Sequence, residues 1–221
     1  MYPLLSTLDD VLIQAQAELP RKVLFLGERS GTISSYAAGW MAGKDTDVIV
    51  LDGANRFNPY VVSSYARRAL IRPEALLKKI RIARAFTCYQ MATLIEEKLT
   101  ALLDRAGPAE RRWVILLGWV TPFLDVDVPD REVRPLFERS LRSAERLARA
   151  APFFVFQPQD LYSYHPLSRG KACFDLKRSF LAERLSQFSD LIWRVDWGDE
   201  GPQMKLEKKI DRRSPGSPIA G

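Results

Sequence analysis

Cysteine and histidine are scarce in this 221-residue sequence, and their scarcity excludes several kinds of site. The two cysteines, Cys88 and Cys173, lie far apart and form neither a disulfide framework nor a metal motif, which favours a reducing, cytoplasmic environment. The single histidine, His165, argues against a histidine-based metal site and against an ordinary Ser-His-Asp triad. We therefore expect no bound metal.

Long apolar runs are also missing, so the sequence contains no segment that could span a bilayer. The first residues include acids and lack a basic region, and we expect no signal peptide. Apolar residues make up 47% of the chain, enough for one domain with its own core. We expect that domain to cover residues 1–210 and the tail, 211–221, to be disordered. The net charge of +6 permits a polyanionic partner without requiring one.

Short apolar segments alternate with helical patterns along the chain. The predicted strands are 22–27, 47–52, 79–84, 113–118 and 153–157, and most are apolar enough to be buried on both faces. The predicted helices are 32–43, 59–70, 88–105 and 130–151. This alternation predicts an α/β fold with a mostly parallel central sheet and helices on both faces. Segments 191–197 and 203–209 flank a glycine-containing turn and predict a C-terminal antiparallel β-hairpin.

The segment GERSGTISS, residues 27–35, joins a predicted strand to a predicted helix. Many proteins bind a nucleotide phosphate at such a junction, through a loop of the form G-x-x-x-x-G-K-[ST]. Here Gly27 and Gly31 are one residue too close, Thr32 stands where the lysine would be, and Ser34 offers a hydroxyl one turn late. Two interpretations stay open: a structural turn, or a degenerate phosphate loop that uses these four residues.

A second succession of motifs runs through residues 51–99. A predicted strand ends at Asp52 and is followed by GANRFNP, a helix with the triplet Ala66-Arg67-Arg68, the segment IARAF (82–86), and Tyr89-Gln90. This order resembles the RecA/RadA recombinase superfamily, in which a strand ending in aspartate precedes a T-E-G-T-F-R-P-E-R-like turn, a helix, a strand ending in A-R-A-F and a glutamine-bearing helix. The resemblance extends from about residue 5 to 210 and implies a RecA-like three-layer core.

The same resemblance indicates which catalytic residues are missing. The family's catalytic glutamate corresponds to Ala54, its magnesium-associated aspartate corresponds to Gly118, and its phosphate-loop lysine has no counterpart. Phosphoryl transfer needs placed positive charge, a metal and a group that orients water. The resemblance therefore implies a pseudo-ATPase, with no required cofactor: ATP binding stays open, and rapid ATP hydrolysis is not expected.

Two DNA-facing loops are implied at 119–131 and 158–178. The first carries Asp125, Asp127 and Asp130, which would repel phosphates and lack the spacing of a calcium loop. The second interleaves aromatic and cationic residues: Tyr162, Tyr164, His165, Arg169, Lys171, Lys177 and Arg178. Aromatic rings stack on bases and cations meet phosphates in single-strand binding, whereas the alternative is an ordinary surface loop. Gln157, before this loop, matches a polar residue that couples nucleotide to DNA in the family.

The predicted helix 130–151 carries an apolar stripe and a stripe of four arginines, Arg139, Arg142, Arg146 and Arg149. The arginines form either a solvated face, with Glu138 and Glu145 as local partners, or a secondary binding surface.

Three functions stay open for the whole chain. The first is a non-catalytic RecA-like accessory protein in DNA recombination or repair, which binds single-stranded DNA, a recombinase or a DNA polymerase. The second is a divergent ATPase that uses residues from a neighbouring subunit. The third is a protein-interaction module without a ligand. We expect a monomer or a small homo-oligomer in the cytoplasm.

Overall fold

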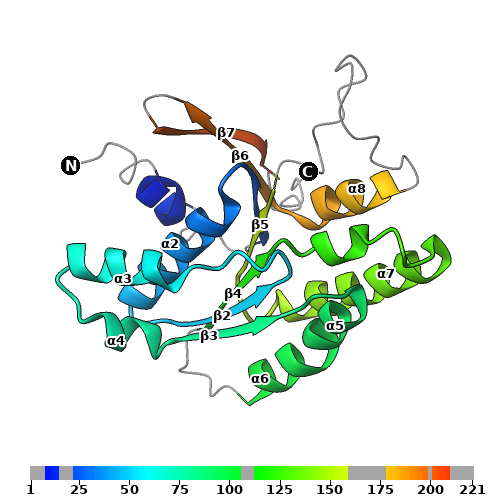
Figure 1. Cartoon of the computed structure of the whole chain (residues 1–221), viewed down its shortest axis with the longest axis horizontal. Helices are drawn as coiled ribbons and strands as arrows, with labels where there is room; N and C mark the ends of the chain where they lie inside the picture. Colours follow the sequence, from blue (N-terminus) through cyan, green and yellow to red (C-terminus); the bar gives the residue numbers. More distant parts are fainter. Residues whose placement is uncertain (1–7, 15–21, 106–111, 159–177, 199–200, 210–221) are drawn as a thin grey trace, which may run out of the picture.

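The computed structural model describes residues 8–14, 22–105, 112–158, 178–198 and 201–209. They contain one seven-stranded sheet in the order β3-β2-β4-β5-β1-β6-β7 (Figure 1). The strands are β1 Lys22–Gly27, β2 Asp47–Asp52, β3 Ile80–Arg84, β4 Arg112–Leu117, β5 Phe153–Gln157, β6 Leu191–Gly198 and β7 Gly201–Lys209. All neighbours pair in parallel except β6 and β7, which form an antiparallel hairpin. The predicted α/β fold and C-terminal hairpin are therefore confirmed.

Helices cover both faces of this sheet. They are α2 Ser30–Gly43, α3 Pro59–Arg68, α4 Pro73–Leu77, α5 Cys88–Thr93, the π-helix η1 Leu94–Leu99, α6 Thr100–Asp104, the 3-10 helix η2 Thr121–Leu124, α7 Asp130–Leu147 and α8 Ser179–Phe188. Residues 8–14 are also helical. In Figure 1, α2, α3 and α4 lie on one side of the sheet, and α5, α6, α7 and α8 lie on the other. The fold thus has three layers.

The strands are apolar on both sides because two separate cores flank the sheet. On the face of α2 and α3, the rings of Phe25 and Phe156 stack with centroids 4.7 Å apart. On the face of α5, α7 and α8, Trp119 and Phe137 lie 5.5 Å apart and are both fully buried. Alternate residues of each buried strand contribute to the two cores, as the period of a β-strand requires.

Local sequence explains where several helices begin. The side chain of Asn58 accepts a hydrogen bond from the amide of Tyr60, and Pro59 occupies the first turn of α3. Thr87 caps α5 in the same way, by accepting from the amide of Gln90. The predicted helix 88–105 contains a π-helical segment in its middle, which the pattern of apolar residues did not indicate.

None of the helices in the described ranges is both long and apolar enough to cross a membrane. Residues 210–221 lie outside those ranges, so the proposed division into a core and a tail stays a prediction.

Candidate functional site

The strands β1, β2, β4 and β5 end at the same edge of the sheet, because they are parallel and in register. Asp52 is paired with Leu117, and Leu26 is paired with Gln157. The glycine turn, the 53–58 turn and the two loops predicted to face DNA all leave the sheet at this carboxyl edge. Open α/β sheets bind their ligands here.

The glycine turn is packed closely on both sides. Gly27 has a φ of 152°, and a β-carbon at this position would collide with the carbonyl oxygen of Val195 in β6. A β-carbon at Gly31 would lie 2.5 Å from the carbonyl oxygen of Arg56. Both glycines are therefore required by the close approach of neighbouring backbone, which gives the turn a structural role.

The hydroxyl groups of the first two turns of α2 mostly bond within the protein. Ser34 and Ser35 both donate to the carbonyl of Gly31, at 3.1 and 2.6 Å, and Ser35 also accepts from the amide of Asn58. The buried hydroxyl of Ser30 has no hydrogen-bond partner among the described residues, and Thr32 is exposed. These contacts favour a structural turn, while anion binding by Gly27, Gly31, Thr32 and Ser34 stays a prediction.

Asp52 organises the turn that follows β2. Its carboxylate is fully buried and accepts hydrogen bonds from the amides of Arg56 and Phe57, at 3.2 and 2.9 Å. The guanidinium of Arg84, at the end of β3, lies 3.7 Å away and supplies the opposite charge. A buried carboxylate needs such partners, so this aspartate and the turn GANRF depend on each other.

Ala54 and Gly118, which the resemblance to the RecA/RadA superfamily aligns with two acids, are in contact. Gly118 has a φ of 61°, and a β-carbon there would lie 2.5 Å from the β-carbon of Ala54. The amides of Gly53 and Ala54 both donate to the carbonyl of Leu117, which fixes this approach. The backbone thus leaves no space for two acidic side chains.

A groove of about 500 Å³ opens at the carboxyl edge beside this contact. Its lining residues come from the ends of four strands, β2 to β5, and the loops that follow them: Gly53, Ala54, Arg56, Phe86, Thr121, Pro122, Leu124, Asp125, Gln157 and Pro158. Gln157 is buried at the base, where its amide oxygen accepts from the backbone of Val120 at 3.2 Å. Its amide nitrogen lies 3.4 Å from the hydroxyl of Thr121. Gln157 therefore ties the end of β5 to the loop that follows β4.

Phe86 is a candidate binding residue that the sequence analysis treated only as part of a family motif. Its side chain is 66% exposed, and its backbone amide donates to the side chain of Gln90 at 2.8 Å. A large apolar ring at the rim of a groove is an unusual use of phenylalanine on a surface. In the sequence, the feature that could have indicated a binding role for Phe86 is the position of an aromatic residue just after the end of a predicted strand.

The second predicted DNA-facing loop lies almost entirely outside the described ranges. This applies to Tyr162, Tyr164, His165, Arg169, Lys171 and Lys177, whose roles stay predictions. Arg178 is described and buried: its Nη1 donates to the carbonyls of Phe123 and Asp125, and its Nη2 to the carbonyl of Val128. Its Nε donates to Asp130 at 3.0 Å. Arg178 thus holds the loop 123–130 in place, and its contact with DNA also stays a prediction.

The acidic residues near Arg178 form contacts that stabilise the loop 123–130. The carboxylate of Asp125 accepts from the amide of Asp127, and Asp130 pairs with Arg178. Within the described part of the chain, no group of three or more His, Cys, Asp or Glu residues could bind a metal ion.

The arginine stripe on α7 is partly paired, though with other partners than the sequence indicated. Arg139 lies 3.6 Å from Glu96 in η1, whereas Glu138 forms a two-point contact with Arg184 of α8 at 2.8 Å. The hydrogen bonds from Arg184 lower the pKa of Glu138. A shallow groove of about 380 Å³ follows the stripe, lined by Glu96, Arg139, Arg142, Ser143 and Arg146.

Comparison with known proteins assigns no family to the chain. No family model matches the sequence, and no curated protein matches it significantly. Function is therefore inferred from the residues and geometry of the carboxyl edge.

Proposed function

We propose that this protein is a non-catalytic RecA-like accessory protein of DNA recombination or repair, which binds single-stranded DNA at the carboxyl edge of its sheet. The mostly parallel sheet is consistent with a P-loop-like fold. The observation that carries the proposal is the groove beside Phe86, because it combines an exposed ring with the cation of Arg56. The chain leaves this groove at Pro158 and continues into the segment that is rich in aromatic and basic residues.

The residues that line the groove have the chemistry needed to bind single-stranded DNA. Bases of any identity stack on aromatic rings, and cations along the same path neutralise phosphates. Phe86 supplies an accessible ring, and Arg56, on the loop after β2, is an exposed cation in the lining of the groove. Asp125 at the rim is the only acid among the residues that line the groove.

The contact between Ala54 and Gly118 supports a role without ATP hydrolysis. Neither residue has a side chain that can orient water or bind magnesium, and the backbone does not admit a larger one at Gly118. An accessory role fits this loss, because binding to a strand or to a recombinase or polymerase requires no chemistry at the turn.

The experiment is a fluorescence-anisotropy titration of a labelled single-stranded oligonucleotide at two salt concentrations, with and without ATP and magnesium. We expect binding that weakens as salt increases and does not depend on ATP. The variant Arg169→Ala/Lys171→Ala should bind more weakly and show a smaller salt dependence. The matched control is Lys44→Ala/Arg105→Ala, which removes the same charge where helices α2 and α6 lead into strands at the opposite edge.

Each outcome separates one function from the others. Equal weakening by both double variants would indicate a general charge effect and contradict a site at the carboxyl edge. Binding that requires ATP and magnesium would favour the divergent ATPase. No binding at concentrations of about 100 μM would contradict DNA binding, since even non-specific binders have dissociation constants of about 1–100 μM. Retention of a recombinase or polymerase in that case would leave a protein-interaction module.

A further inference from the structure

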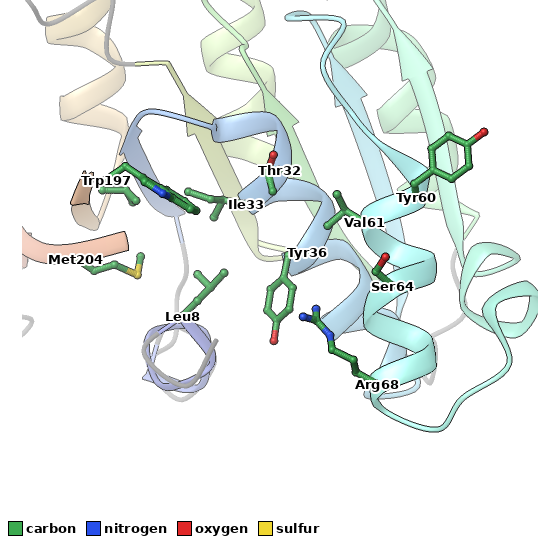
Figure 2. Close-up of a pocket in the computed structure, with 11 residues that line it drawn as sticks. Leu8, Thr32, Ile33, Tyr36, Tyr60, Val61, Ser64, Arg68, Trp197 and Met204 are labelled. Carbon is green, nitrogen blue, oxygen red and sulfur yellow. The ribbon is translucent and has the colours of Figure 1, made fainter. Parts of the chain in front are cut away.

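A second cavity, of about 340 Å³, lies on the α2–α3 face of the protein (Figure 2). It is enclosed by α2, α3, the helix at residues 8–14 and the β6–β7 hairpin, and it shares no lining residue with the groove at the carboxyl edge. Its volume falls in the range of about 300–1,000 Å³ that is typical of small-molecule sites. Nothing in the proposed DNA-binding function uses it.

The walls of this cavity are mainly apolar. Leu8, Ile33, Val61, Val195 and Met204 provide the aliphatic surface. Tyr60 contributes an exposed ring, and Tyr36 and Trp197 provide the two less exposed aromatic rings. Figure 2 shows Ile33 between these two rings, with Leu8 closing the side formed by the N-terminal helix. A surface of this composition favours a ligand with a flat apolar body.

Both rings are held in place by contacts outside the cavity. The hydroxyl of Tyr36 donates to Asp9 at 2.8 Å, and the ring of Tyr65 packs edge-on against it with centroids 5.3 Å apart. The guanidinium of Arg29 lies 4.2 Å from the centre of the Trp197 ring. The cavity is therefore largely pre-formed, and a ligand would not have to order these side chains on binding.

One charged side chain lines the cavity. Arg68, in the last turn of α3, lies over the ring of Tyr36 with its guanidinium 5.8 Å from the ring centre. Among the residues that the structure describes, no carboxylate lies within ion-pair distance of Arg68, although burial raises the pKa of Asp9 and the charge of Arg68 acts to lower it. The Tyr36 hydroxyl already bonds Asp9, so the guanidinium and the hydroxyls of Thr32, Tyr60 and Ser64 are the polar groups left for a ligand.

We propose that this cavity binds a small aromatic anion, whose ring lies among Ile33, Tyr36 and Trp197 and whose acid group bonds Arg68. A planar guanidinium binds carboxylate, sulfonate or phosphate oxygens with two parallel hydrogen bonds, and this pairing selects an anion over a neutral molecule of the same shape. The assignment is independent of DNA binding, since it concerns another face of the sheet.

The test uses two fluorescent probes that share a naphthyl-phenylamine body. One is anionic, 8-anilinonaphthalene-1-sulfonate, and the other is neutral, N-phenyl-1-naphthylamine. Titration of the folded full-length protein should show one site for each, with the anionic probe bound more tightly. Arg68→Ala should weaken binding of the anionic probe about tenfold or more, because a hydrogen bond to a charged group contributes about 1.5–3 kcal/mol. The same variant should leave the affinity for the neutral probe almost unchanged.

Two variants that fill the cavity and one control complete the experiment. Ile33→Trp and Val61→Phe should each abolish binding of both probes while circular dichroism shows a folded protein; the second variant serves if the first does not fold. Arg67→Ala removes the same charge from the neighbouring position, which does not line the cavity, and should bind both probes normally. Unchanged binding in a folded, cavity-filled variant, or equal weakening by Arg67→Ala and Arg68→Ala, would overturn the proposal.

Discussion

Gly118 lies against Ala54 so closely that a β-carbon on Gly118 would be 2.5 Å from that of Ala54. These are the positions of the magnesium-associated aspartate and the catalytic glutamate in the resembled superfamily. The resemblance therefore aligns two acids of that superfamily with residues that lie against each other in this fold. An acid at Gly118 would have to displace Ala54 and Thr121, whose β-carbon and hydroxyl would lie 2.5 and 2.8 Å from the added β-carbon.

We predict that Gly118→Ala lowers the free energy of unfolding by about 1–3 kcal/mol, since a residue with a β-carbon is strained at positive φ. Contact with Ala54 adds to this cost. Urea denaturation followed by circular dichroism measures the difference. Gly43→Ala is the control, because Gly43 is helical and its added β-carbon would meet side chains alone: the hydroxyl and ring of Tyr65, at 3.3 and 3.4 Å, and Ile71, at 3.7 Å. A Gly118 variant no less stable than the Gly43 variant would show that the close contact is not important.

Asp52→Ala should destabilise the protein by about 2–4 kcal/mol. The substitution leaves the amides of Arg56 and Phe57 without their hydrogen-bond acceptor. It also removes the buried carboxylate that pairs with Arg84. Arg84→Ala should cost less than about 1 kcal/mol, because that side chain is about half exposed. Thermal and urea unfolding of the two variants would check this order. The reverse order would mean that the charge pair, rather than the amide contacts, holds the turn.

The fold was largely predictable from the sequence, because buried parallel strands are continuous apolar runs. The predicted segments 22–27, 47–52 and 153–157 coincide with β1, β2 and β5, and the hairpin was also predicted. The short helix α4 was missed, because five residues are too few to show a helical period.

The candidate site was predictable only in part, because its contacts join residues that are distant in sequence. The approach of Gly118 to Ala54 depends on how two strand ends meet, which no local pattern records. The basic neighbours of Arg178 predict a DNA contact, which stays a prediction, but they do not indicate that its guanidinium bonds carbonyls about fifty residues earlier. Long-range hydrogen bonds of this kind leave no periodic signal in a single sequence.

Arg178→Ala should therefore destabilise the protein by about 3 kcal/mol or more, because three carbonyls and the carboxylate of Asp130 lose their donor. Arg178→Lys should recover only part of the loss, since one ammonium cannot reach all of these acceptors. Chemical denaturation would measure both variants, with Arg131→Ala as an exposed control near the same loop. If Arg178→Ala is as stable as Arg131→Ala, the bonds of Arg178 do not stabilise the loop 123–130.

The contact between Glu138 and Arg184 predicts a pH dependence of stability. Arg184 lowers the folded-state pKa of Glu138 below its ordinary 4.5, so the contact stabilises the fold above that pH. This contribution is lost as the pH falls through the lowered pKa. Because both groups are partly solvated, we expect it to be about 1 kcal/mol. Between about pH 6 and pH 3, the wild-type protein should lose that much more stability than Glu138→Gln. Glu145→Gln, on the same helix, should follow the wild type.

Phe86 gives the most direct test of the groove. Phe86→Ala should weaken binding of a single-stranded oligonucleotide by about 1–3 kcal/mol, which is the contribution of one stacked base. It should change the free energy of unfolding little, because the ring is 66% exposed. Phe86→Trp should preserve the affinity, since it keeps a stacking surface, whereas Phe86→Leu should behave like alanine. Tyr60→Ala is the control: its ring is 80% exposed and does not line the groove. If Phe86→Ala and Tyr60→Ala weaken oligonucleotide binding equally, the bases of the DNA do not stack on Phe86 in this groove.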